Sequence, residues 1–170
     1  ALAERFGVEP SRLEQFTIGA ALHDIGKLDI PDEVLQKPGR LSEAEFDIIK
    51  QHPRLGYERL VRMGESDRTV LDLVRWHHER VDGLGYPDGL KGDDIPTPAR
   101  YFSVIDSFDA LTSYRPYRSE VGPEAAERAI EELRAGIDTR YCGECVEAFV
   151  DLYRRGELGW ILEYYNDRAD

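Results

Sequence analysis

The stretch Ala21-Leu22-His23-Asp24-Ile25-Gly26-Lys27 places an imidazole, a carboxylate and an ammonium close together in the chain. These groups suit an apolar core poorly, because each would need a buried partner. Imidazole nitrogen and carboxylate oxygen are ligands for divalent iron, manganese or zinc, and a lysine one helical turn later can hold a phosphate that the metals also hold. Taken alone, the pair His23-Asp24 is more often an ordinary helix end with a hydrogen-bonded histidine. The remainder of the chain decides between these interpretations.

The helix that carries this stretch is predicted to begin near Ser11. Ser11 to Glu14 form a capping box, and Leu13, Phe16 and Ala20 fall on one face with the His-Asp pair. We expect Gly26 to end this helix. The pair then lies at the inner C-terminal end.

A second capping box, Ser42 to Glu45, opens the next predicted helix. Its buried stripe is expected to comprise Phe46, Ile49, Leu55 and Leu60. Within it, His52 precedes Pro53, and a proline removes a backbone donor, so the helix should kink or restart there. A single histidine beside such a break is more often a hydrogen-bonded bystander than a ligand.

A third helix is predicted from Ser66 or Asp67 to His77-His78-Glu79-Arg80. Adjacent helical residues point about 100° apart, so two neighbouring histidines can address two sides of one centre. Glycines at positions 83, 85 and 89 follow, and they indicate tight turns or a close approach of the backbone to a ligand.

The segment from Ala99 to about Ser113 is apolar nearly all round, which predicts a buried helix. Asp106 and Asp109 lie inside it, and a buried carboxylate requires a partner or a metal. Further helices are predicted at about 124–134, 145–155 and 158–166. We find no repeat and no convincing strand.

Composition narrows the function classes. The 170 residues suffice for one domain with a single core, and the net charge of −12 argues against non-specific binding to duplex DNA. No apolar run approaches the roughly 20 residues of a membrane span, and no signal peptide opens the chain, so we expect a cytosolic protein. Cys142 and Cys145 lack a second pair of metal ligands nearby and are expected to be reduced structural thiols.

All of the chain's histidines, at positions 23, 52, 77 and 78, fall at predicted helix ends or breaks, as does Asp24, while Asp106 lies in the apolar helix. Each one alone has an ordinary structural interpretation. Together they are difficult to assign to packing, and a metal site in the core of a helical bundle explains them all.

The motifs also resemble those of the HD-GYP branch of the HD phosphohydrolases. The resemblance covers roughly residues 17–118 and is carried, in order, by His23-Asp24-Ile25-Gly26-Lys27, Ile30-Pro31-Asp32, Lys37-Pro38-Gly39, His52, His77-His78-Glu79-Arg80, Asp82-Gly83-Leu84-Gly85-Tyr86-Pro87 and Arg115-Pro116-Tyr117-Arg118. It implies an all-α bundle that hydrolyses a cyclic dinucleotide, usually cyclic di-GMP, to linear pGpG or to GMP.

The resemblance also implies roles for individual residues. The metal ligands would be His23, Asp24, His52, His77, His78 and Asp106, holding two or three divalent metals, most often iron and sometimes manganese. Asp24 would bridge two metals, whose bound water would attack the phosphodiester in line. Lys27, Arg115 and Arg118 would hold the phosphates, with Asp24 and Lys27 as the catalytic pair. Gly85-Tyr86-Pro87 would shape the pocket and is an expected contact for diguanylate cyclase domains.

Two departures from the family pattern keep alternatives open. A further histidine and, in three-metal members, a glutamate would lie on a helix before Ala1, so we expect the chain to be the C-terminal part of a longer protein. Near the C-terminus, Gly136-Ile137-Asp138-Thr139-Arg140 stands where the family often has Gly-x-Phe-Asp-Pro. The alternatives are a non-catalytic module that binds cyclic di-GMP, and a phosphodiesterase for another cyclic dinucleotide such as cyclic GMP-AMP. Residues 1–170 are treated as one domain, with C-terminal helices over 123–167.

Overall fold

The computed structural model describes residues 12–113 and 123–157, and this part of the chain is helical, as predicted. Its α-helices, in chain order, are α2 (Leu13–Leu22), α3 (Asp32–Leu35), α4 (Glu43–Ile49), α5 (His52–Arg62), α6 (Arg68–Trp76), α7 (Thr97–Thr112), α8 (Pro123–Ala135) and α9 (Gly143–Arg154). Two 3-10 helices, η2 (Ile25–Asp29) and η3 (Gly92–Asp94), join them. The described residues form no strand, only an isolated bridge between Ile137 and Tyr141.

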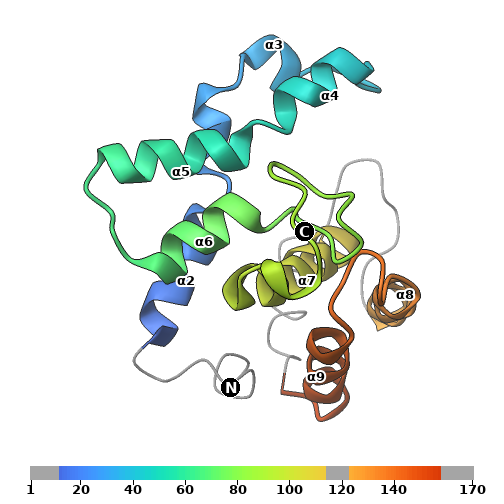
Figure 1. The fold of residues 1–170 in the computed structure, drawn as a ribbon. Helices are drawn as coiled ribbons and strands as arrows, with labels where there is room; N and C mark the ends of the chain where they lie inside the picture. Colours follow the sequence, from blue (N-terminus) through green and yellow to red (C-terminus); the bar gives the residue numbers. More distant parts are fainter. Residues whose placement is uncertain (1–11, 114–122, 158–170) are drawn as a thin grey trace, which may run out of the picture.

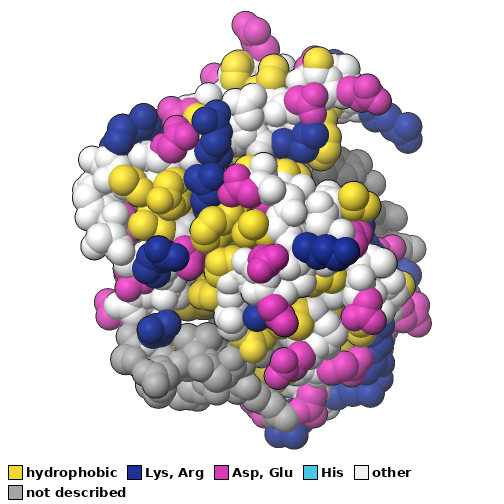
Figure 2. Space-filling view, in the orientation of Figure 1, with side chains coloured by type: hydrophobic (Ala, Val, Ile, Leu, Met, Phe, Trp, Pro, Cys, Tyr) yellow, Lys and Arg dark blue, Asp and Glu magenta, His cyan; other side chains and the backbone are white. Residues whose placement is uncertain are grey.

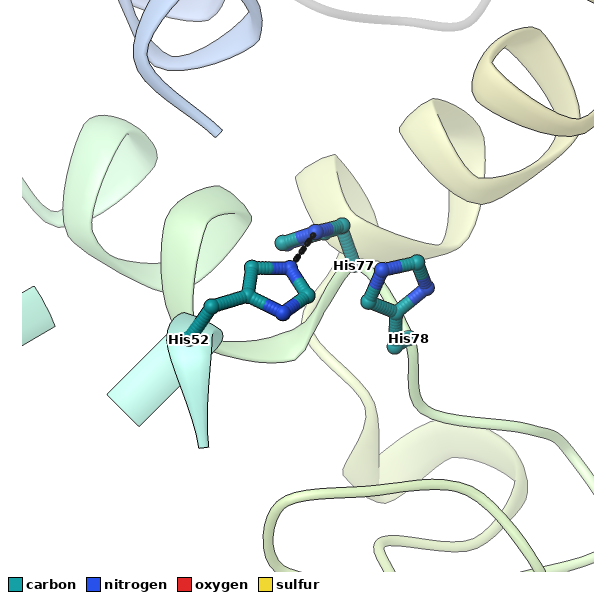
Figure 3. Close-up of side chains that lie close together, drawn as sticks. All are labelled: His52, His77 and His78. Atoms are coloured by element: carbon teal, nitrogen blue, oxygen red, sulfur yellow. Dashed lines mark hydrogen bonds between the residues drawn. The ribbon is translucent and has the colours of Figure 1, made fainter. Parts of the chain in front are cut away.

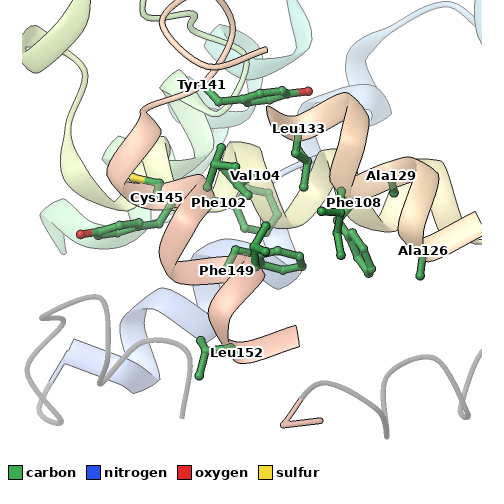
Figure 4. Packing of buried hydrophobic residues seen from close by; sticks show 14 of the residues in the cluster. Phe102, Val104, Phe108, Ala126, Ala129, Leu133, Tyr141, Cys145, Phe149 and Leu152 are labelled. Atoms are coloured by element: carbon green, nitrogen blue, oxygen red, sulfur yellow. The ribbon is translucent and has the colours of Figure 1, made fainter. Parts of the chain in front are cut away.

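Helix α7 is the central element of the bundle. It packs against α6 on one side and against α8 and α9 on the other (Figure 1). Its Phe102, Val104 and Phe108 lie in the main hydrophobic core with Phe149 of α9 and Leu133 of α8 (Figure 4). The nearly all-apolar composition of α7 is explained by this position, since neighbours cover most of its circumference.

A smaller apolar cluster joins the N-terminal half of the chain. Leu60 of α5 and Val70, Leu71 and Val74 of α6 are buried together, with Ile25 of η2 packed against them. Helix α2 also packs on α6, and α5 packs on η2. The ends of α2, α5 and α6 are therefore fixed by apolar contacts close to where the histidines lie.

Several helix boundaries are those that the sequence predicts. The Ser42 capping box is present, with the Glu45 N–H donating to the Ser42 hydroxyl and the Ser42 N–H to the Glu45 carboxylate. The helix breaks after Ile49 and restarts at His52, with Pro53 in the first turn of α5. Asp67 caps α6 by accepting from the Thr69 and Val70 N–H groups.

The prediction of a helix continuing to Arg80 was wrong, because α6 ends at Trp76. The Val74 carbonyl, which would accept from residue 78 in a longer helix, is instead 2.9 Å from Nδ1 of His77. The histidine thus takes up one of the terminal carbonyls and helps to stop the helix.

Gly26 does not end α2, contrary to the expectation. The helix ends at Leu22, and Gly26 lies within η2 without a positive φ angle. A Cβ atom at this position would stand 2.0 Å from the His52 carbonyl oxygen and 2.4 Å from the Gly56 nitrogen. The absence of a side chain at Gly26 therefore allows η2 to contact the first turn of α5, which carries His52.

Phe46 is not part of a buried stripe, since 47% of its surface is exposed. Helix α4 packs chiefly against the short α3, and the two lie together at one end of the molecule (Figure 1). The Phe46 ring meets the edge of Tyr86 at 6.5 Å between centroids. Of the predicted stripe, Leu60 is buried and Ile49 and Leu55 are partly covered.

Some predicted features lie outside the described residues. These are the Ser11 capping box, the arginines at 115 and 118, and the helix at 158–166. In the described ranges no helix has the length and apolar composition needed to span a membrane. Acidic and basic side chains are interspersed over the face of the molecule in Figure 2.

The close packing at Gly26 can be tested by adding a single methyl group. Gly26→Ala should lower the free energy of unfolding by about 3 kcal/mol or more, because the new Cβ meets backbone rather than a flexible side chain. Urea titration followed by circular dichroism would measure it. Gly19→Ala in α2 is the control, as its Cβ would meet atoms no closer than 3.3 Å. Equal stability of the two variants would contradict the packing described here.

Candidate metal centre

Helix ends converge on one point of the bundle. His52 begins α5, while His77 and His78 follow the last turn of α6. One ligand-capable atom from each ring lies within 4.8 Å of the others, and the rings face one another in Figure 3. His52 and His77 are buried, and His78 is partly buried. Residues separated by a loop and a helix therefore present three imidazoles to a common space.

Backbone carbonyls orient most of these rings. Nδ1 of His23, His52 and His77 lies 2.7, 2.8 and 2.9 Å from the carbonyl oxygen of the residue three positions earlier. A carbonyl can only accept, so Nδ1 of each ring carries the proton and donates it. In the neutral ring, Nε2 is then left with its lone pair. This is the arrangement by which proteins orient a histidine that ligates a metal.

The contact between His52 and His77 tests whether this site suits a cation. Their Nε2 atoms are 3.3 Å apart, the contact dashed in Figure 3. If both rings are neutral and donate through Nδ1, two lone pairs face each other, which is unfavourable without a positive charge between or beside them. A proton or a metal ion would make the arrangement favourable. The donor set therefore fits a divalent metal of the type that imidazole binds.

Asp24 lies between two of the histidines. Its Oδ1 is 3.2 Å from Nε2 of His52, and its Oδ2 is 3.3 Å from Nε2 of His23. Lys27 also contacts Oδ2, through Nζ at 2.6 Å. Each carboxylate oxygen thus faces a different imidazole.

Asp106 approaches the cluster from α7. Its Oδ1 is 3.8 Å from Nε2 of His23, while the His23 ring packs on Phe102 with 4.9 Å between centroids. Asp106 is partly rather than fully buried, so the expectation of a buried carboxylate is only partly met. Asp109, the other acid of α7, accepts from the Ser113 hydroxyl instead.

Burial and neighbouring groups set the charge of this cluster. Burial, together with the neighbouring histidines, holds the pKa of His77 well below its usual value and lowers the pKa of His78 to about 3. Burial would raise the pKa of Asp24, but its close contacts with His23, His52 and Lys27 outweigh burial and lower that pKa. Near neutral pH the protein thus presents His77 and His78 as neutral imidazoles near the ionised carboxylate of Asp24, which are the forms that bind metals.

Glu79 organises the loop beside the histidines, a role that sequence reasoning missed. Its buried carboxylate accepts from the backbone N–H groups of Asp88, Gly89 and Leu90 at 2.7, 3.1 and 3.0 Å. The chain after His78 is thereby folded back on itself. The only sequence signal was the run of glycines that follows.

Gly85 and Tyr86 lie in this folded-back loop. A Cβ at Gly85 would stand 2.4 Å from the Arg80 nitrogen, so this glycine lets the loop lie against the backbone of Glu79 and Arg80. The Tyr86 ring packs on His78 with 4.8 Å between centroids, and the Tyr86 N–H donates to the His78 carbonyl. Tyr86 thus forms a wall of the site.

A cavity of about 180 Å³ opens beside the cluster. Its lining residues include His77, His78, Tyr86 and Asp106, together with Glu79 and Arg80. Sequence reasoning gave no site role to the remaining lining residues, which are Ser103, Ser107, Arg140 and Tyr141. Arg140 and Tyr141 come from the turn between α8 and α9, where Arg140 ends the Gly136–Arg140 stretch that departs from the family pattern.

The structure thus brings together His23, Asp24, His52, His77, His78 and Asp106, with Lys27 and Tyr86 beside them. Arg115 and Arg118, predicted to hold phosphates, lie outside the described residues. Cys142 and Cys145 are free thiols at the start of α9, as predicted.

Comparison with known families gives this constellation a context. The family model described as HD domain matches residues 1–143 of the chain. The chain belongs to the HD domain family. Phosphohydrolases of the HD domain family are metal-dependent, which agrees with the imidazole and carboxylate donors gathered here.

Curated relatives of this HD domain are named as enzymes that act on cyclic dinucleotides. The cyclic di-GMP phosphodiesterase of Thermotoga maritima is 42% identical over 165 residues, which cover 91% of the chain and 43% of that protein. The cyclic di-GMP phosphodiesterase response regulator RpfG of Xanthomonas campestris pv. campestris is 47% identical over 88% of the chain and 39% of its own length. The 3'3'-cGAMP-specific phosphodiesterase 2 of Vibrio cholerae is 36% identical over 88% of the chain and 28% of its own length.

A solved structure shares the fold. Bd1817, an HDG"Y"P protein from Bdellovibrio bacteriovorus, matches 91% of this chain and 48% of its own with a TM-score of 0.69 at 24% identity. The HD domain described here spans about two fifths of the length of the first two curated relatives.

The role of Glu79 can be tested by removing its charge at constant shape. Glu79→Gln should lower the free energy of unfolding by about 1–3 kcal/mol. The NH₂ group of the glutamine would face a backbone N–H group that donates to a carboxylate oxygen of Glu79 in the wild type, and two donors cannot bond to each other. Thermal and urea unfolding would measure the loss. Glu131→Gln, an exposed change on α8, is the matched control. Unchanged stability of Glu79→Gln would show that the three bonds do not hold the loop.

Proposed function

We propose that this HD domain is a metal-dependent phosphodiesterase that hydrolyses a cyclic dinucleotide, with cyclic di-GMP as the first candidate substrate. The observation that carries the proposal is Asp24, whose two carboxylate oxygens each face a different histidine. The naming of cyclic di-GMP phosphodiesterases among the relatives supports the substrate.

The proposed ligands are the residues gathered around Asp24. His52, with His77 and His78, would hold one metal on the Oδ1 side of Asp24, and His23 with Asp106 would hold a second on the Oδ2 side. Iron or manganese suits this mixed set of nitrogen and oxygen ligands. Two metals are proposed, and three is the alternative number. Bound metals would supply an activated water and a Lewis acid for the phosphodiester oxygens.

The chain's own groups would prepare the substrate for attack. Lys27 lies next to Asp24 and is partly exposed, so its ammonium can contact a phosphate oxygen while holding the carboxylate in place. Tyr86 covers His78 and limits access of bulk water to that side of the cluster. Arg115 and Arg118 are proposed as additional phosphate ligands on the basis of the sequence motif alone.

A mixed cyclic GMP-AMP is the second candidate substrate. The 3'3'-cGAMP-specific phosphodiesterases 1 and 3 of Vibrio cholerae are 40% and 39% identical to the chain, similar to the relatives named for cyclic di-GMP. Similarity at this level does not separate the two substrates. A competition assay with both cyclic dinucleotides would do so.

The Gly85-Tyr86-Pro87 loop is also proposed as a contact for diguanylate cyclase domains. Leu84, next to this loop, has 76% of its surface exposed. Burial of this exposed leucine against a partner would remove apolar surface from water and stabilise the contact. Loss of cyclase binding in Leu84→Asp, measured by calorimetry, would support this contact.

Asp24 provides the main test of the proposed activity. In Mn²⁺ or Fe²⁺, the chain should convert cyclic di-GMP to pGpG or GMP, and a chelator should abolish the conversion. Asp24→Asn should lower kcat/KM at least about a hundred-fold, more than the loss of a residue that only supports a ligand. Liquid chromatography of the products and metal analysis of the purified protein would follow both effects.

Asp29→Asn is the matched control, because Asp29 is an acid of η2 that pairs with Arg59 at the surface. It should retain activity and metal. Metal-loaded wild-type protein with no cleavage of any cyclic dinucleotide would refute the proposed function.

Lys27 can be separated from the metal ligands by its effect. Lys27→Gln should lower kcat about a hundred-fold, as expected for loss of a donor to the reacting phosphate, while metal content stays near the wild-type value. Lys37→Gln, which removes a surface lysine paired with Glu45, should change neither quantity. A Lys27 variant that loses its metals would instead assign Lys27 to the support of Asp24.

A further inference from the structure

The cavity beside the histidines is lined by two arginines as well as by the acids Glu79 and Asp106. Its volume of about 180 Å³ is below the roughly 300–1,000 Å³ of pockets that hold a whole small ligand, so it can take one part of a larger molecule. Arg80 and Arg140 are its cationic lining residues. A ligand part with acceptor atoms in one plane would suit a guanidinium there.

The two arginines differ in how far the protein already uses them. Arg80 donates through both Nε and Nη2 to the carboxylate of Asp82, so its fork is occupied. Arg140 donates only through Nη2, to the Glu132 carbonyl and carboxylate at 3.2 and 3.3 Å. Within the described ranges no acceptor is recorded for its Nε and Nη1. Arg140 therefore keeps donors for a ligand.

A rigid turn holds Arg140 at the cavity. The N–H groups of Arg140 and Tyr141 both donate to the Gly136 carbonyl, at 2.8 and 3.0 Å. A Cβ at Gly136 would stand 2.7 Å from the Tyr141 ring, so the ring packs closely on this glycine, and the Arg140 guanidinium lies 5.2 Å from the ring centroid. The Thr139 carbonyl accepts from the Asp82 N–H at 2.9 Å, which ties the turn to the loop after His78.

We infer that Arg140 is a specificity-determining residue that reads a guanine base of the substrate in this cavity; the inference rests on the proposed function. Guanine presents O6 and N7 as two acceptors in one plane, which match the arginine fork, whereas adenine presents a donor in place of O6. Ser103 and Ser107 line the same cavity and can bond the remaining polar edges of either base. Arg140 thus favours a guanine over an adenine next to the histidine cluster.

The test compares three substrates in two variants. Arg140→Gln removes the charge and the fork, and Arg140→Lys keeps the charge alone. Both should lower kcat/KM for cyclic di-GMP about ten- to a hundred-fold, the range of one bidentate arginine-guanine pair. The kcat/KM for cyclic di-AMP should change less than about two-fold in either variant. In the wild type, cyclic GMP-AMP should be cleaved with its guanine bound at Arg140. Its kcat/KM should fall in the variants by a factor between those for the other two substrates.

Arg134→Gln is the matched control. Arg134 lies near the end of α8, pairs with Glu147 and does not line the cavity, and it carries the same charge. Circular dichroism and thermal unfolding would establish that each variant folds. If Arg140→Gln lowered kcat/KM equally for all substrates while Arg140→Lys stayed active, Arg140 would be assigned to a phosphate. That outcome would overturn the inference that Arg140 recognises the base. No change for any substrate would also overturn it.

A binding measurement separates this inference from the proposed function. Calorimetric titration of the chain with GMP and with AMP requires no turnover. Arg140→Gln should remove a preference for GMP while Arg134→Gln retains it. If the wild type cleaves nothing but prefers GMP through Arg140, the phosphodiesterase proposal fails and the inference stands. If the wild type cleaves cyclic di-GMP but its preference for GMP does not depend on Arg140, the phosphodiesterase proposal stands and the inference about Arg140 fails.

Discussion

The structure depends on hydrogen bonds between histidine rings and the helix carbonyls behind them. His23, His52 and His77 each bond through Nδ1 to the carbonyl three residues earlier. A terminal carbonyl of a helix has no partner within the helix, and here a ring supplies it. The same bond fixes the tautomer and aims Nε2 away from the helix. Helix end and candidate ligand are thus one residue, so the arrangement of helices sets the geometry of the cluster.

This constraint explains why apolar packing lies so close to a polar site. The cluster of Leu60, Val70, Leu71 and Val74 fixes α5 against α6, and Phe102 of α7 packs on the His23 ring. Burial costs free energy for any charged imidazole, so it favours the neutral rings that a metal needs. Gly26 completes the arrangement, because only a residue without a side chain allows η2 to meet the His52 carbonyl. Packing and ligand geometry therefore cannot be altered independently at this position.

Much of the fold and the ligand cluster could be predicted from the sequence, because local rules act there. Capping at Ser42 and Asp67, the break at Pro53 and the apolar α7 each follow from a few adjacent residues. Gathering of the histidines was predicted from their shared location at helix ends. The errors have two causes. Phe46 is apolar, but its helix packs on α3 rather than on the core, which is a tertiary effect. Helix α6 stops early where the His77 ring bonds to the Val74 carbonyl, a local contact that competes with the helix.

The roles of Glu79 and Arg140 were missed by sequence reasoning for a different reason. Glu79 matters through backbone donors nine to eleven residues later, and Arg140 through a turn that follows α8. Neither has a local pattern that marks its role. Their positions show that the two parts of the site have different supports. Helix ends carry the histidines, whereas loops joined by the bond from the Asp82 N–H to the Thr139 carbonyl carry Arg80 and Arg140. A change in the 136–141 turn would therefore alter the cavity wall at Arg140 and Tyr141 without displacing a histidine.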